Sequence, residues 1–214
     1  MTAIILASGN PGKLRELQAL LRPRGFELRP QSAFGVQTPP ETGATFAENA
    51  LLKARHAARV TGLAALADDS GIEVDALGGR PGVYSARFAG ENASDRQNVD
   101  KLLDELRSVP PEKRSARYRA VIVLLRDAND PEPLVASGTW EGTLTQAPLG
   151  SGGFGYDPIF VPTGLTRTAA QLTPEEKNAV SHRAQALKAL LATLEAGTYA
   201  GITTEKLSEG AAPQ

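Results

Sequence analysis

The chain contains 214 residues, of which 23 are Lys or Arg and 24 are Asp or Glu, so its formal net charge is −1. A hydrophobic content of 41% and a charged content of 22% are typical of a globular protein, and the lack of a basic excess argues against long nucleic acid as a partner. The absence of cysteine excludes disulfides and thiolate metal sites, which leaves oxygen and imidazole as metal ligands.

No apolar run reaches membrane-spanning length, and Met1 leads almost directly into the first predicted strand without a signal peptide. We therefore expect a cytoplasmic protein with no membrane partner. The length suits one domain, residues 1–197, followed by a loosely ordered tail, residues 198–214.

The first chemical signal lies near the N-terminus. Apolar residues 3–7 predict a buried strand, the turn 8–12 is small and polar, and leucines at helical spacing follow Lys13. A strand, a glycine-containing turn and a helix with a lysine at its start are typical of a phosphate cradle. The segment fails the Walker A pattern, because Ala7 replaces a required Gly and Leu14 replaces Ser or Thr. An ordinary strand-to-helix turn with a solvent-exposed lysine is the alternative.

Further along, the composition predicts a strand over residues 26–29, a loop over 31–43 and an alanine-rich helix over 45–60. Lys53 lies four residues after Asn49 on one face of this helix, a spacing that by itself is typical of a solvated lysine.

A buried strand over residues 63–67 is predicted to end at Asp68, Asp69 and Ser70. Together with Glu41 in the preceding loop, these acids suit Mg²⁺ or Mn²⁺, and ligands of open α/β sheets gather at strand carboxyl ends. Adjacent residues on a strand point to opposite faces, so only one of the two aspartates should meet a ligand directly. Ordinary turn chemistry is the alternative.

The second half of the chain is rich in predicted strands. The remaining predicted elements are, in chain order, a strand at 72–76, a turn at 78–82, a helix at 94–107, β-rich segments at 120–125 and 133–144, and a glycine-rich loop at 150–155. We expect an α/β fold with an elongated mixed β-sheet and flanking helices, arranged as two lobes around a central cleft.

The glycine-rich loop ends in Phe154, Gly155, Tyr156 and Asp157. An aromatic face for stacking and polar groups for a base edge are the parts that a nucleobase pocket needs. Covering the end of the sheet is the simpler role for either aromatic ring alone.

Residues 177–183 pose a geometric problem. On one unbroken helix, Lys177, His182 and Arg183 could not all line one pocket. We predict that the helix breaks near residues 178–180 and restarts with Ser181 as N-cap, which places His182 and Arg183 in a first turn at a positive helix end. A continuous surface helix with scattered cations is the alternative.

Taken together, these segments resemble the Ham1-type inosine and xanthosine triphosphate pyrophosphatases from Ile4 to about Leu194. The resemblance rests on the motifs Ser8-Gly9-Asn10…Lys13, Glu41-Thr42-Gly43…Phe46…Glu48-Asn49-Ala50…Lys53-Ala54, Ala67-Asp68-Asp69-Ser70-Gly71, Pro81-Gly82…Ser85-Ala86-Arg87, Gly152-Gly153-Phe154-Gly155-Tyr156-Asp157-Pro158-Ile159-Phe160 and Ser181-His182-Arg183.

The resemblance implies a Mg²⁺-dependent homodimer, with Mn²⁺ as a substitute metal, that cleaves ITP, dITP or XTP between the α and β phosphates. It also implies roles for individual residues. The phosphate ligands would be Ser8, Gly9, Asn10, Lys13 and Lys53; Glu41 and Asp69 would engage the metal, with Asp69 also orienting or deprotonating the attacking water; and the nucleotide contacts would be Ser70, Phe154, Gly155, Tyr156, Asp157, Lys177, His182 and Arg183. Such a site works by positioning and charge neutralisation.

Selectivity has a physical basis in this scheme, because hypoxanthine and xanthine carry an oxo acceptor where adenine carries an amino donor. A donor such as Arg183 or a backbone N–H would be left unpaired by adenine, a loss of roughly 1–3 kcal/mol per group. Two alternatives stay open: a pyrophosphatase for another modified nucleotide, and a nucleotide-binding regulator without catalysis. The Walker A failures disfavour a P-loop kinase or GTPase.

Overall fold

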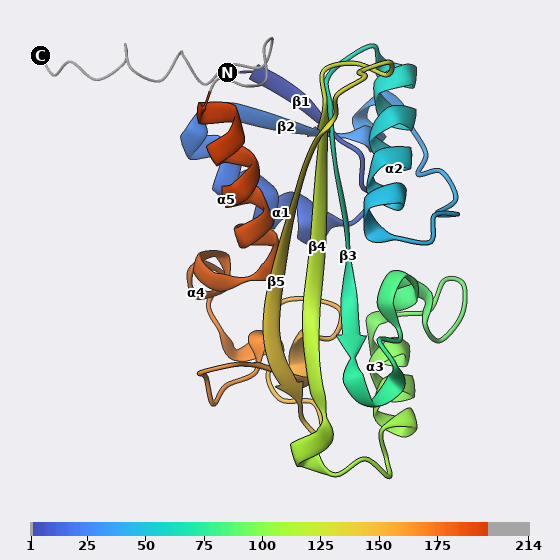
Figure 1. Ribbon diagram of the computed structural model, residues 1–214, viewed down its shortest axis with the longest axis vertical. Helices are drawn as coiled ribbons and strands as arrows, with labels where there is room; N and C mark the ends of the chain where they lie inside the picture. The colour runs from blue at the N-terminus through green and yellow to red at the C-terminus, as the bar shows by residue number, and fades with distance from the viewer. Residues whose placement is uncertain (1, 197–214) are drawn as a thin grey trace, which may run out of the picture. The chain divides into compact units, whose positions relative to one another are not determined.

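The computed structural model describes residues 2–196 (Figure 1), so the predicted tail lies outside the described residues. The described residues form two compact units. Unit 1 comprises residues 2–69, 121–138 and 183–196, and unit 2 comprises residues 70–120 and 139–182. Within residues 2–196, no helix combines the length and the apolar character needed to cross a membrane.

Within the described part of the chain, six strands form one mixed sheet, which confirms the predicted α/β class. They are β1 (Thr2–Leu6), β2 (Phe26–Pro30), β3 (Ala65–Val74), β4 (Ser115–Leu125), β5 (Leu134–Leu144) and β6 (Phe160–Pro162). Their order in the sheet is β2-β1-β3-β4-β5-β6. β1 pairs in parallel with β2 and β3, whereas β5 and β6 are antiparallel. Two lobes around a central cleft stay a prediction.

Helices flank the sheet (Figure 1), and polar residues fix where they begin. The helices are α1 (Pro11–Leu21), α2 (Phe46–Thr61), α3 (Asp95–Glu105), α4 (Pro174–Val180) and α5 (His182–Glu195). Capping boxes start three of them, in which a Ser or Thr side chain and a Glu or Gln three residues later satisfy otherwise unpaired backbone N–H groups: Thr45 with Glu48, Ser94 with Gln97, and Thr173 with Glu176.

The strand that carries the acidic residues is longer than predicted. Instead of ending at Asp68, β3 runs through Asp68, Asp69 and Ser70 to Val74, so the expectation of two separate strands is wrong. β1 stops beside β3 at the pair Leu6 and Leu66, but β3 continues because β4 pairs along its other edge. The acids therefore lie in the middle of one strand, just beyond the point where its parallel neighbour ends.

Each unit has its own hydrophobic core. In unit 1, the alanine face of α2 packs against Ile5 of β1, Ala65 of β3 and Val123 of β4, because small side chains allow a close approach of helix and sheet. In unit 2, α3 packs against β3, β4 and β5, and the aromatic residues Tyr118, Trp140 and Phe160 fill the space between them.

Gly142, in the middle of β5, allows β6 to approach closely. A Cβ atom at this position would meet the carbonyl oxygen of Val161 and, at 2.7 Å, the ring of Phe160. We expect Gly142→Ala to lower the free energy of unfolding by about 1–3 kcal/mol, because the added methyl must displace backbone. Urea denaturation measures this. Ser137→Ala, at an exposed position of the same strand, is the control, and an equal effect of the two substitutions would contradict the argument.

Candidate functional site

The Asp68 side chain is the centre of a buried ion-pair network in unit 1. Its carboxylate lies 2.7 Å from Lys13 Nζ of α1 and 3.2 Å from Arg183 Nε of α5. Arg183 also pairs with Glu16 of α1. Burial disfavours the charged carboxylate, but the two cations outweigh this and hold the pKa of Asp68 well below its ordinary value. Asp68 is therefore a structural anion that connects α1 and α5 to β3.

Asp69, the next residue of β3, belongs to a second set of charges. Lys53 Nζ of α2 lies 2.6 Å from an Asp69 oxygen and 2.8 Å from a Glu41 oxygen. Burial raises the pKa of Asp69 to about 6, even though Lys53 acts in the opposite direction. Successive strand residues point to opposite faces, which explains why Asp68 and Asp69 have different cations as partners.

The two sets meet at the backbone of β3. Lys13 and Lys53 both donate to the carbonyl oxygen of Asp68, at 3.2 and 3.1 Å. Lys53 is 4% exposed, so the interpretation of its spacing as that of a solvated lysine is wrong. Unit 1 thus concentrates three cations and four carboxylates around a few residues of β3, and each cation is paired with at least one carboxylate. We call this group the charge cluster; its members are Lys13, Glu16, Glu41, Lys53, Asp68, Asp69 and Arg183.

The N-terminal turn is organised by its own side chains. Asn10 caps α1, because its Oδ1 accepts from the N–H groups of Gly12 and Lys13 at 2.8 and 3.2 Å. Ser8 Oγ accepts from Asn10 N at 3.1 Å, and Gly9 is exposed. In this structure Asn10 therefore occupies two of the backbone donors that the phosphate-cradle interpretation assigns to an anion. Phosphate contact by Ser8, Gly9 and Asn10 stays a prediction.

The predicted helix break is confirmed. α4 ends at Val180, Ser181 is extended with φ −67° and ψ 161°, and α5 begins at His182. His182 and Arg183 thus occupy the first turn of α5, as expected, and the continuous-helix alternative is wrong. The break assigns the two neighbours to different units, since Arg183 joins the charge cluster of unit 1 and His182 packs in unit 2.

In unit 2, Asp157 connects the other predicted nucleotide contacts. Its Oδ2 accepts from Lys177 Nζ at 2.5 Å and from the backbone N–H of Phe154 at 2.9 Å. Lys177 Nζ in turn lies 4.8 Å from the centre of the Phe154 ring, within cation–π range. Gly153 lies beside this carboxylate with φ 69°, and a Cβ there would overlap Asp157. The structure therefore brings Phe154, Asp157 and Lys177 together.

Phe154 and Gly155 also line a pocket of about 290 Å³ within unit 2. The start of α3, two prolines and residues 150–153 of the glycine-rich loop form the rest of its wall. Asp95 of α3 accepts a hydrogen bond from Gly155 N at 2.6 Å. A mainly apolar wall beside a charged group is the usual composition of a small-molecule pocket.

Two of the predicted nucleotide contacts, Tyr156 and Arg183, bind other groups of the protein in this structure. Tyr156 is buried and donates to the carbonyl of Ser85 at 2.8 Å, and burial raises the pKa of its hydroxyl. Arg183 is 1% exposed and bound to Asp68 and Glu16, so contact with a base would require it to exchange a partner. Ser70 is partly buried in β3. Nucleotide contact by these three residues stays a prediction.

The sequence interpretation missed Glu16 and Tyr118. Glu16 lies one helical turn after Lys13, a spacing that places both on one face of α1 and could have indicated a shared role. Tyr118 donates to Asp157 Oδ1 at 3.2 Å and stacks on His182, with ring centres 4.6 Å apart. No local pattern indicates Tyr118, because strand alternation predicts its burial but not what it touches.

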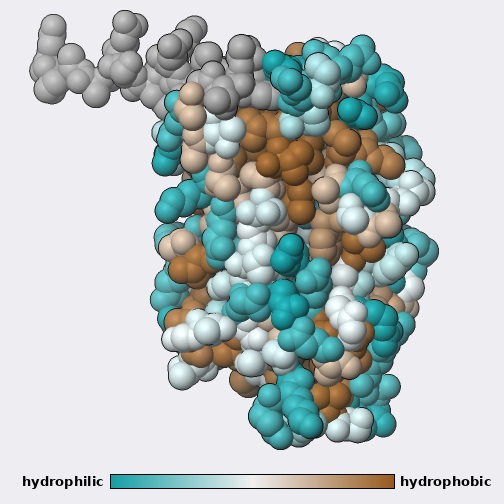
Figure 2. Space-filling model, in the orientation of Figure 1, coloured by the Kyte–Doolittle hydropathy of each residue, from teal (hydrophilic) through white to brown (hydrophobic). Residues whose placement is uncertain are grey.

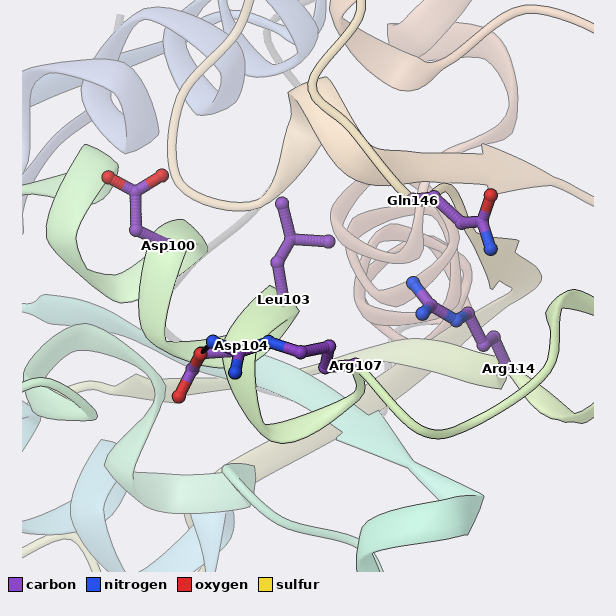
Figure 3. A pocket seen from close by; sticks show the side chains of 6 residues that line it. All are labelled: Asp100, Leu103, Asp104, Arg107, Arg114 and Gln146. Atoms are coloured by element: carbon purple, nitrogen blue, oxygen red, sulfur yellow. Dashed lines mark hydrogen bonds and ion pairs between the residues drawn. The ribbon is translucent and has the colours of Figure 1, made fainter.

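A second pocket of unit 2, of about 380 Å³, contains none of the predicted site residues (Figure 3). Its lining residues come from α3 and the segments after it, and they are Asp100, Leu103, Asp104, Arg107, Arg114 and Gln146. Arg114 is buried and donates to the carbonyls of Val109, Thr145 and Leu106, so its guanidinium holds neighbouring loops together.

Among the described residues, no group of three or more His, Cys, Asp or Glu side chains is arranged to hold a metal ion. Glu41 and Asp69 do converge on one ammonium group, so their oxygens face a single cation. Carboxylate oxygens suit Mg²⁺, which commonly takes one or two protein ligands and completes its shell with phosphates and water. The donor set therefore fits a magnesium ion that arrives with a phosphorylated ligand.

Removal of the Asp68 charge tests its structural role. We expect Asp68→Asn to lower the free energy of unfolding by about 3–5 kcal/mol, because Lys13 and Arg183 would stay buried with too little negative charge nearby. Guanidinium denaturation at neutral pH measures this. Asp100→Asn, at an exposed ion pair with Arg96 on α3, is the control and should cost less than about 1 kcal/mol. A similar small cost for both substitutions would contradict the assignment.

Several known proteins are similar to this chain. The model of the Ham1 family matches residues 4–193. A dITP/XTP pyrophosphatase of Shigella flexneri is 57% identical over 197 residues, which are 92% of this chain and all of that protein. One from Pectobacterium atrosepticum is 59% identical over 194 residues, 91% of this chain and 98% of that protein.

Solved structures are also similar. A HAM1 protein from Coxiella burnetii has a TM-score of 0.82 at 51% identity, covering 91% of this chain and 98% of its own. A nucleoside-triphosphatase / dITP/XTP pyrophosphatase from Mycobacterium abscessus has a TM-score of 0.71 at 49% identity, covering 89% and 99%. The match to the family model over nearly the whole described chain, together with curated relatives at 57% and 59% identity, establishes that this chain belongs to the Ham1 family.

Proposed function

We propose that this protein hydrolyses non-canonical purine nucleoside triphosphates, namely dITP, ITP and XTP, to the monophosphate and pyrophosphate, and so cleanses the nucleotide pool. The observation that carries the proposal is the charge cluster, in which Lys13 and Lys53 converge on the Asp68 carbonyl beside Glu41 and Asp69. Relatives more than half identical to this chain are named dITP/XTP pyrophosphatases.

In this proposal unit 1 handles the phosphates. Lys13 and Lys53 neutralise phosphate oxygens, and Glu41 and Asp69 would hold Mg²⁺, which would supply positive charge where negative charge develops. Asp69 orients the attacking water and accepts its proton, which a carboxylate can do when it lies within hydrogen-bond reach. Asp68 keeps Lys13 in position rather than acting on the substrate, because it is fully buried and paired.

Unit 2 recognises the base. Phe154 offers an aromatic face, and Lys177 is a donor for the oxo group that hypoxanthine and xanthine share. Adenine carries an amino donor at this position and would leave such a donor unpaired, which costs roughly 1–3 kcal/mol, about a 5- to 150-fold preference.

One assay tests the reaction. The protein is incubated with dITP, XTP, GTP or ATP, with MgCl₂ or with EDTA, and both phosphate products are identified. We expect pyrophosphate from dITP and XTP only when the metal is present. Orthophosphate as the first product would instead indicate a γ-phosphatase, and turnover of another modified nucleotide in preference to dITP and XTP would favour the alternative substrate class.

Substitution of Asp69 tests whether the protein is a catalyst or a nucleotide-binding regulator. We expect Asp69→Asn to lower kcat for dITP by roughly 10²–10⁴-fold, because the water loses its base and the metal loses a ligand. Asp100→Asn is the matched control. Thermal unfolding of both variants checks that the loss is not one of folding, and a kcat within threefold of the parent chain would contradict the assignment.

Assembly as a homodimer in the cytoplasm is part of the same proposal and rests on the family resemblance. It is supported by a hydrophobic area on the face seen in Figure 2, over the part of β4 and β5 that belongs to unit 1. Sedimentation equilibrium distinguishes a dimer from a monomer.

A further inference from the structure

We infer that Tyr118 is a positioning residue for base recognition, acting on His182 through its ring and on Asp157 through its hydroxyl. The inference rests on the proposed function and deepens it, because it concerns how unit 2 holds its recognition groups in place. Tyr118 lies on β4, and the alternation of this strand buries its side chain together with those of Ala116 and Ala120.

The ring of Tyr118 fixes the plane of His182. The two rings are nearly parallel, at 7°, with their centres 4.6 Å apart. Trp140 lies on a similar plane, 6.3 Å from His182 and inclined by 22°. Phe160 meets Tyr118 edge-on at 4.8 Å, which holds the Tyr118 ring from the side. An imidazole stacked on such a layer keeps its ring orientation, since rotation would break the stacked contact.

The hydroxyl of Tyr118 reaches the second recognition group. It donates to Asp157 Oδ1 at 3.2 Å, while Asp157 Oδ2 accepts from Phe154 N and Lys177 Nζ. The carboxylate is therefore held on both oxygens, and its plane determines where Lys177 and the Phe154 backbone lie. One buried side chain thus contacts two residues that the family resemblance assigns to the nucleotide, His182 and Asp157.

The two contacts should not be equally important. Asp157 keeps two other donors when the Tyr118 hydroxyl is removed, whereas His182 loses the surface on which it lies when the ring is removed. Tyr118→Phe should therefore raise KM for dITP by no more than about threefold. Tyr118→Leu should raise it by at least about tenfold, equivalent to ~1.4 kcal/mol.

The effect should fall on KM rather than kcat. The recognition groups of unit 2 would bind the base equally in the ground state and the transition state, and loss of such uniform binding raises KM with little change in kcat. We expect kcat of Tyr118→Leu to stay within about threefold of the parent chain. A loss of folded protein would instead lower the apparent kcat and leave KM unchanged.

Phe88→Leu is the matched control. It removes an aromatic ring from the same hydrophobic core of unit 2, at a residue 9% exposed, where the ring faces Lys101 and Arg80. We expect it to destabilise the protein to a similar extent with KM for dITP unchanged. Equal increases of KM in Phe88→Leu and Tyr118→Leu would overturn the inference. A KM of Tyr118→Leu equal to that of the parent chain would also overturn it, as would a KM of Tyr118→Phe as high as that of Tyr118→Leu.

A binding measurement separates this inference from the proposed function. Trp140 is the only tryptophan of the chain and lies within the stacked layer, so its fluorescence reports dITP binding in EDTA, without turnover. We expect the dITP dissociation constant to follow the same order, with Tyr118→Leu at least about tenfold weaker than the parent chain and Phe88→Leu unchanged. Binding with this order but no hydrolysis in MgCl₂ would contradict the proposed function and keep the inference, whereas no binding by the parent chain in either EDTA or MgCl₂ would overturn both.

Discussion

The alternation of side chains along β3 is the constraint on which the site depends. Asp68 and Asp69 are neighbours in sequence, yet their carboxylates leave opposite faces of the strand and pair with different cations. Lys13 of α1 and Arg183 of α5 contact Asp68, and Lys53 of α2 contacts Asp69. A displacement of one residue along β3 would exchange these partners and leave each cation facing the wrong side chain.

Burial raises the free-energy cost of these charges and restricts the positions of their partners. Removing a charge from water costs several kcal/mol, so a buried ion is tolerated only when its partners are close and well oriented. The charge cluster meets this condition by sharing partners, since Lys53 faces two carboxylates and Arg183 faces two others. Because Lys13, Lys53 and Arg183 lie on α1, α2 and α5, the same contacts that lower the cost of burial also fix these three helices on the sheet of unit 1.

Unit 2 uses a related solution with fewer charges. Asp157 accepts from a lysine, a backbone N–H and a tyrosine, and the surrounding rings exclude water from these bonds. Gly153 is part of the same solution, because its positive φ and missing side chain leave room for the carboxylate. The chain thus holds its polar groups by charge pairing in one unit and by an aromatic layer in the other.

Much of this could be predicted from local patterns. The N-terminal strand-turn-helix segment, the capped helices and the break at Ser181 follow from turn chemistry and helical spacing, which depend on neighbouring residues alone. The buried leucine stripe of α5 follows from the same periodicity. The motifs also sufficed to identify the Ham1 family, since ordered blocks along the chain carry the resemblance.

Only the tertiary structure decided where β3 ends, which aspartate faces which lysine, and that Lys53 is buried. These facts depend on β4 pairing beside β3 and on helices far away in sequence, and no window of sequence contains both partners. The roles of Glu16 and Tyr118 belong to the same class. A sequence records which charges and rings are available, whereas the close approach of distant elements determines which of them pair, because ion pairs and ring stacking act only over a few ångströms.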